Sequence, residues 1–179
     1  MRGKIFILAV LVCVMELACV GNLDAGVFSP RRLQIALGTL GSLSATPGTI
    51  SFQATNPALG FVSGSSPGGL TWVVLGGLNA QNWTLSVQAG SSSFVGCPTI
   101  PTSAILVTCG SHSVSGGGGT AACGGSFPLS TTPQQVAGGF EGAGTNSYSI
   151  SMNFTLAESW RYVAKSACTI TITYTVNAP

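Results

Sequence analysis

Apolar and polar residues alternate with a period of two through most of the chain, and this alternation predicts β-strands. In residues 168–176 every second residue from Ile170 to Val176 is apolar and threonines lie between. Residues 148–156 repeat the pattern, beginning with Tyr148. Because successive side chains of a strand point to opposite faces, each segment should have one face in the core and one in water. We expect the two segments to form an antiparallel pair.

Further strands are predicted between turns rich in glycine and proline, such as residues 66–69. They are residues 49–54, 70–75, 83–89 and 104–109. Helical spacing is nearly absent, and only residues 157–163 have a helix-compatible composition. Residues 111–125 are rich in glycine and are predicted to form a loop. The pattern indicates an all-β fold, an antiparallel β-sandwich of Greek-key or jelly-roll type with seven to eight strands.

The N-terminus has the order of an export signal. Arg2 and Lys4 precede an apolar run over residues 5–14, and a small-residue cleavage site ends at Ala25. Lipidation of Cys19 is an alternative. The apolar run is too short for the roughly 20 residues that span a membrane, so no membrane span is predicted.

We therefore divide the chain into a signal peptide (1–25), an N-terminal strand with a linker (26–48) and a disulfide-bonded β-sandwich (49–179). The mature protein is expected to be secreted, extracellular or on the cell surface.

Four cysteines remain after cleavage, Cys97, Cys109, Cys123 and Cys168. An even set behind an export signal predicts a disulfide framework, and the absence of a Cys-x-x-Cys motif argues against zinc. Four cysteines allow three pairings. We predict Cys97 with Cys109 and Cys123 with Cys168.

Few charges remain in the mature chain, which carries only Arg31, Arg32, Glu141, Glu158, Arg161 and Lys165. The net charge of +2 and the lack of basic clusters exclude a nucleic-acid partner. Uncharged polar side chains, glycans or neighbouring copies must then keep this surface hydrated or covered. Asn82 and Asn153 each begin an Asn-x-Thr sequon and are the candidate glycosylation sites of a glycoprotein.

The chain offers little for catalysis. His112 is the only histidine, and Glu141 and Glu158 are the only acids that follow the predicted cleavage site. Hydrolytic metal sites and catalytic triads need more such groups than these. We predict that the protein is not an enzyme and that it has neither a cofactor nor a metal site.

Three tryptophans raise the question of sugar binding. Trp72 and Trp83 lie in apolar strand patterns and are expected in the core. Trp160 and Tyr162 lie in a polar segment and are the candidates for stacking on a glycan.

Residues 82–87 (Asn-Trp-Thr-Leu-Ser-Val) contain a Trp-x-Leu motif, and residues 171–179 have a similar character. This motif resembles that of a family of bacterial cell-surface β-sandwich domains that bind the cell wall. The resemblance implies a secreted module that binds cell-wall or other polysaccharide.

Residues 33–40 have alternating apolar positions at Leu33, Ile35 and Leu37, and Leu40 ends the segment. They follow the signal and Arg32, and residues 41–48 are predicted to be a linker. The whole chain resembles pilin-like secreted subunits of bacterial surface fibres, in which an N-terminal strand completes the sheet of the next subunit. The resemblance implies a structural subunit that assembles head to tail with copies of itself into a filament or surface layer. In the alternative, the strand folds back into its own subunit.

Overall fold

The structure is a computed structural model that describes residues 32–36, 40–46, 49–53, 60–77, 81–159 and 168–177. At residues 32–36, 40–43 and 76–77 only the backbone is described. The predicted signal peptide (1–25) and most of the helix-compatible segment (157–163) lie outside these residues.

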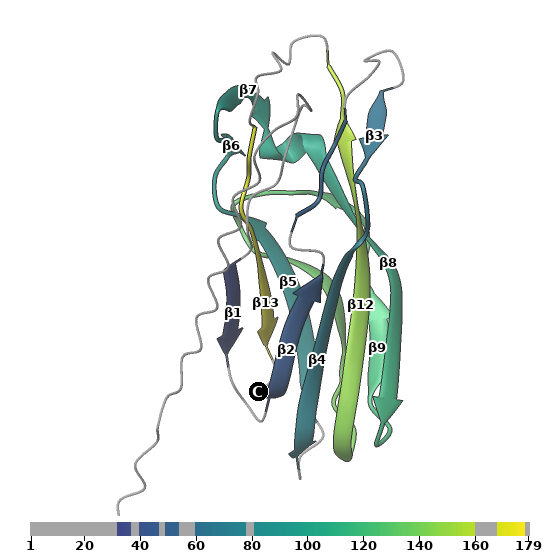
Figure 1. Cartoon of the computed structure of the whole chain (residues 1–179). Coiled ribbons are helices and arrows are strands. Elements are labelled where there is room, and N and C mark those ends of the chain that lie inside the picture. Colours follow the sequence, from purple (N-terminus) through teal and green to yellow (C-terminus); the bar gives the residue numbers. More distant parts are fainter. Residues whose placement is uncertain are drawn as a thin grey trace, which may run out of the picture.

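The described residues form almost only β-strands, which confirms the predicted all-β class (Figure 1). The strands are β1 (Arg32–Ala36), β2 (Leu40–Thr46), β3 (Phe61–Ser63), β4 (Gly68–Gly77), β5 (Asn82–Ala89), β6 (Ser93–Phe94), β7 (Cys97–Pro101), β8 (Ile105–Gly116), β9 (Thr120–Cys123), β10 (Phe127–Pro128), β11 (Gln134–Phe140), β12 (Gly144–Ala157) and β13 (Ile172–Asn177). One 3-10 turn, Thr102–Ala104, precedes β8.

Two main sheets are present. Sheet 1 has the order β1-β13-β5-β11-β9, and sheet 2 has the order β10-β8-β12-β4-β2, with β3 pairing with the end of β12. The pairings within them are antiparallel except that of β1 with β13, which is parallel. Strands β6 and β7 form a small separate hairpin.

The core lies between the two main sheets. The inward positions of β12 are buried from Asn146 to Leu156, and those of β13 are buried from Ile172 to Val176. Serines, threonines and Asn153 alternate with them on the outer face of β12. The period of two therefore predicts the buried side chains of β12 correctly, whereas on β13 Thr173 of the polar phase is buried as well.

The predicted pairing of the last two long strands is wrong. β12 lies in sheet 2 and pairs with β3, β4 and β8, whereas β13 lies in sheet 1 and pairs with β1 and β5. Alternation fixes which face of a strand is buried, but it does not say which strand lies beside it.

Two other boundaries differ from the prediction. Most of the predicted loop at residues 111–125 is strand, because β8 continues to Gly116 and β9 spans Thr120–Cys123, and only residues 117–119 and 124–125 lie outside strands. Residues 49–53 form no strand beyond a bridge at Ser51, although Ile50 and Phe52 are buried as expected. The number of strands in the described residues also exceeds the seven to eight predicted.

Candidate assembly edge and disulfide frame

The N-terminal strand β1 lies at the end of sheet 1 and pairs only with β13 among the described strands. The register places Leu33 opposite Tyr174 and Ile35 opposite Val176. Both partners are almost completely buried. Here β1 belongs to the same chain as β13, which is the fold-back arrangement left open above.

The segment after β1 is a strand rather than a linker. Leu40 begins β2, which pairs with β4 at the end of sheet 2, so the linker predicted at residues 41–48 is wrong for residues 41–46. Leu37 lies outside the described residues. Because only residues 37–39 join β1 to β2, the N-terminal segment passes from the edge of one sheet to the edge of the other (Figure 1).

All four predicted cysteines are in disulfides, but the predicted pairing is wrong. Cys97 bonds to Cys168, and Cys109 bonds to Cys123. The first bridge lies beside the hydrogen-bonded pair of Val95 and Thr169, which brings β7 next to the segment that leads into β13. The short sequence distance between Cys97 and Cys109 suggests that these two cysteines pair. Cys97 instead bonds to a cysteine that is 71 residues away in the sequence.

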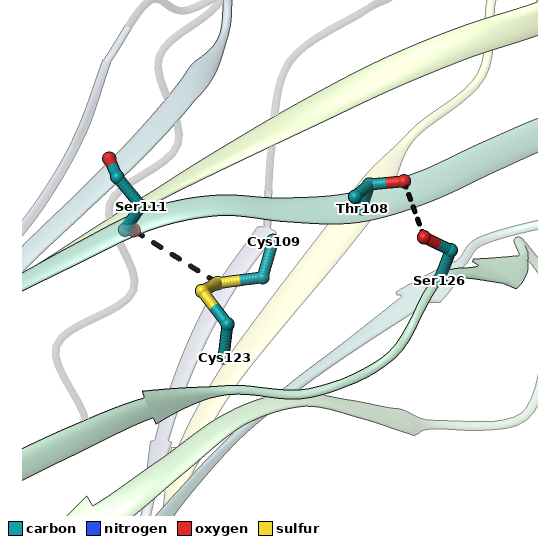
Figure 2. Close-up of a disulfide and its surroundings, with 5 residues drawn as sticks. All are labelled: Thr108, Cys109, Ser111, Cys123 and Ser126. Atoms are coloured by element: carbon teal, nitrogen blue, oxygen red, sulfur yellow. Dashed lines mark hydrogen bonds between the residues drawn. A yellow bond between two sulfur atoms is a disulfide. The ribbon is translucent and has the colours of Figure 1, made fainter.

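The second bridge joins the two sheets. Cys109 lies on β8 of sheet 2, and Cys123 lies on β9 of sheet 1 (Figure 2). Beside it the hydroxyls of Thr108 and Ser126 are 2.8 Å apart and share a hydrogen bond. Cys123 is exposed, whereas both cysteines of the first bridge are buried. The two disulfides are compatible with an oxidising extracellular compartment.

Three aromatic side chains fill the core between the sheets. The ring of Trp72 is stacked on that of Tyr148 with centroids 5.3 Å apart, and Trp83 meets both rings edge-on. The Trp83 indole N–H donates to the carbonyl oxygen of Thr120 at 3.2 Å. As predicted, Trp72 and Trp83 are buried, so neither indole face is available to a sugar.

Asn146 holds together the two turns that cap this cluster. Its side-chain N–H groups donate to the carbonyl oxygens of Glu141 at 3.1 Å and Gly144 at 3.0 Å. Its Oδ1 accepts from the backbone N–H of Gly119 at 3.1 Å. Asn146 is completely buried, so these bonds satisfy polar groups that water does not reach.

Glycines allow these turns to approach each other. A Cβ at Gly117 would overlap the carbonyl oxygen of Ala143, and a Cβ at Gly142 would overlap the backbone of Gly119. Gly142 also has a φ of 51°, which disfavours other residues. The glycine-rich segment therefore serves close backbone packing.

Glu141 is the acidic residue beside these turns. Its side chain is buried, and burial raises the pKa of its carboxyl above the usual 4.5. Burial also raises the pKa of Tyr148, and the negative charge of Glu141 adds to that rise, while the hydrogen bond with Trp83 opposes it. Tyr148 stays protonated and donates to the carbonyl oxygen of Phe140 at 3.0 Å.

This burial gives a prediction on pH dependence. A carboxyl whose pKa is raised by folding stabilises the fold below its unfolded pKa, and that contribution is lost as pH rises through the folded pKa. We expect Glu141→Gln to increase the free energy of unfolding at pH 7 and to flatten its decline above pH 4.5. Urea unfolding at a series of pH values measures both. An unchanged pH profile would contradict the assignment to Glu141.

The other sequence candidates are placed as follows. Trp160 and Tyr162 lie outside the described residues. Asn82 begins β5 and Asn153 lies within β12, and both side chains are exposed, so each would tolerate a glycan. His112 is exposed on β8.

Two kinds of feature are absent from the described residues. No group of three or more histidine, cysteine or acidic side chains lies together there in a way that could hold a metal ion. In the same part of the chain, no helix has the length and hydropathy needed to cross a membrane.

The sequence prediction missed Asn146 and the role of Glu141. The signal was present, because Asn146 falls in the inward phase of β12 with Tyr148 and Ile150. A polar side chain in that phase predicts buried hydrogen bonds.

Comparison with known protein families, curated sequences and solved structures finds no match to this chain.

Proposed function

We propose that the protein is a structural subunit of an extracellular filament or surface layer, which polymerises when β1 of one copy pairs with β13 of the next. The observation that carries the proposal is the position of β1. It is an N-terminal strand at the end of sheet 1, and among the described strands it pairs only with β13.

Exchange of β1 would replace the β1–β13 ladder within one chain by an identical ladder between two copies. A second copy presents the same β13 edge, so its β1–β13 ladder would have the same register, with Leu33 opposite Tyr174. Exchange of an identical element between protomers is a low-cost route to assembly. Parallel ladders are slightly less stable per residue than antiparallel ones, which favours release of β1 over release of a central strand.

The composition of the surface agrees with assembly. The outer positions of β12 and β5 carry hydroxyl and amide side chains, among them Ser149, Asn153, Thr84 and Gln88. A surface with so few charges has little electrostatic repulsion between copies. A strand donated in one direction gives a head-to-tail contact that does not close, so the product is a filament.

Engineered cysteines test this proposal directly. Gln34 is opposite Thr175 in the β1–β13 ladder. When a chain with Gln34→Cys is co-expressed with a chain with Thr175→Cys, we expect covalent heterodimers on non-reducing gels. The control replaces Thr175→Cys by Gln88→Cys, which is on the neighbouring strand β5, opposite Thr173, and should give none.

The fold-back alternative makes the opposite prediction. A chain carrying both Gln34→Cys and Thr175→Cys would then cross-link only within itself, and co-expression of the single variants would give no heterodimer. If both results are obtained at the protein concentrations reached during secretion, strand donation is refuted.

A further inference from the structure

The two disulfides differ in how easily an external thiol can reach them. Cys97 and Cys168 of the first bridge are each only 1 % exposed. In the second bridge Cys123 is exposed and Cys109 is half-buried. The chain beside Cys123 is open as well, because a Cβ added to Gly125 would meet no heavy atom within 4 Å. A thiolate must reach a disulfide sulfur to react with it, so only the second bridge is open to thiols in the folded protein.

Strand β9 depends on the second bridge at its Cys123 end. None of its four side chains is buried, and among them only Ala121 packs partly against the core. Beyond the short ladder with β11, this end is held by the disulfide to β8 and by the adjoining Gly124 amide, which donates to the carbonyl oxygen of Val136 at 2.8 Å. Loss of the bridge would leave backbone hydrogen bonds alone to hold it.

The other end of β9 is held by buried side chains. The carbonyl oxygen of Thr120 accepts from the indole N–H of Trp83, and the Gly119 amide donates to the side chain of Asn146. Trp83 and Asn146 are both almost completely buried. These contacts do not involve the cysteines, so they can persist when the bridge is cleaved.

We propose that the second bridge is a modification site for external thiols, and that its cleavage releases the Cys123 end of β9 from β11 while the rest of the sandwich stays folded. A thiolate attacks Sγ of Cys123 and forms a mixed disulfide with it. The bond to Cys109 breaks, and Cys109 leaves as a thiolate that takes a proton from water. A second thiol then displaces the first from Cys123, so two external thiols are oxidised to a disulfide while the bridge is reduced to two thiols.

The surroundings of the bridge suit the reduced form. Sγ of Cys109 lies 4.0 Å from the carbonyl oxygen of Ser111 (Figure 2). In the disulfide this sulfur carries no hydrogen, whereas a Cys109 thiol can donate to that oxygen. Release of the Cys123 end would also uncover the backbone of Ala137, which is opposite Cys123 on β11. The bridge thus couples the surrounding thiol concentration to one edge of sheet 1, and β1 lies at the other edge, so this inference does not rest on strand donation.

Alkylation of the folded wild-type protein tests the modification site. The protein is incubated with dithiothreitol or reduced glutathione, quenched with iodoacetamide and digested, and the labelled cysteines are identified by mass spectrometry. We expect the second bridge to be labelled roughly a hundredfold faster than the first, because the buried pair becomes accessible only when the fold opens. With glutathione, the trapped mixed disulfide should lie on Cys123. Equal labelling of the two bridges, or a mixed disulfide mainly on Cys109, would overturn the assignment.

Hydrogen exchange tests the release of β9. After selective reduction and alkylation, exchange at the Gly124 amide should accelerate roughly tenfold more than exchange at the Gly119 amide or at the Val95 amide, which donates to Thr169 beside the first bridge. A variant with both Cys109→Ala and Cys123→Ala should reproduce this pattern without reductant or alkylation.

Thr108→Ala is the matched control, because it removes the hydrogen bond to Ser126 beside the second bridge and keeps the disulfide. It should leave exchange at Gly124 unchanged. Equal acceleration at Gly124, Gly119 and Val95 would mean that the bridge holds the whole fold, and unchanged exchange at Gly124 would mean that it holds nothing there. Either result would overturn the proposed release.

Discussion

Replacing Cys97 and Cys168 by alanine is expected to lower the free energy of unfolding by about 4 kcal/mol, because the bridge closes a long loop in the unfolded chain. The two residues are 71 apart in sequence, and loop-closure entropy grows with that separation. Both cysteines are buried, so the alanines also remove packed sulfur atoms from the core. The midpoint of thermal unfolding should fall by roughly 10 °C, as calorimetry would show.

The matched control is the second bridge. Cys109 and Cys123 are 14 apart, so replacing both by alanine should cost about 3 kcal/mol by the same relation. The exposure of Cys123 also makes the accompanying loss of packing smaller. If the Cys109 and Cys123 replacements prove the more damaging pair, then the assignment of the long bridge as the main constraint is wrong.

The sequence was most informative where a single local property decides the structure. Alternation in β5 and β12 correctly predicts that Trp83 and Tyr148 are buried and that Asn82 and Asn153 are exposed. Burial of a strand face depends on the period of apolar residues, and that period is written in consecutive positions.

Long-range pairing could not be predicted in this way. The partners of β12 and β13 and the bond between Cys97 and Cys168 depend on which distant segments meet. Several arrangements of strands bury the same faces equally well, so the alternation cannot select among them. For the same reason the sequence predicts a linker at residues 41–48, because the glycine and serines of residues 41–46 hide a strand that only its neighbour β4 makes evident.

The turn between β8 and β9 illustrates a third limit. A run of glycines usually indicates a loop, and the glycines at residues 116–119 predict one over residues 111–125. Here glycine is needed because Gly117 packs against Ala143 with no room for a Cβ. β8 ends at this crowded turn and β9 begins after it in the other sheet, so the residues on both sides of the turn are ordinary strands.

Replacing Asn146 by alanine should destabilise the protein by about 3 kcal/mol. The change leaves the N–H of Gly119 and the carbonyl oxygens of Glu141 and Gly144 without their side-chain partner at a buried position. Each buried group left unpaired costs about 1 to 3 kcal/mol, and relaxation of the turns toward water offsets part of that sum. Urea unfolding measures the loss, and hydrogen exchange at the Gly119 amide should accelerate more than exchange in β5.

Asn153→Ala is the control, because it removes the same amide from an exposed position of the same strand. It should change stability by less than about 0.5 kcal/mol. Equal losses in the two variants would mean that the asparagines act through strand propensity alone. A loss confined to Asn146, with Gly119 exchanging fastest, would show that one buried amide holds the β8–β9 turn against the start of β12 and so closes the end of the sandwich over its aromatic core.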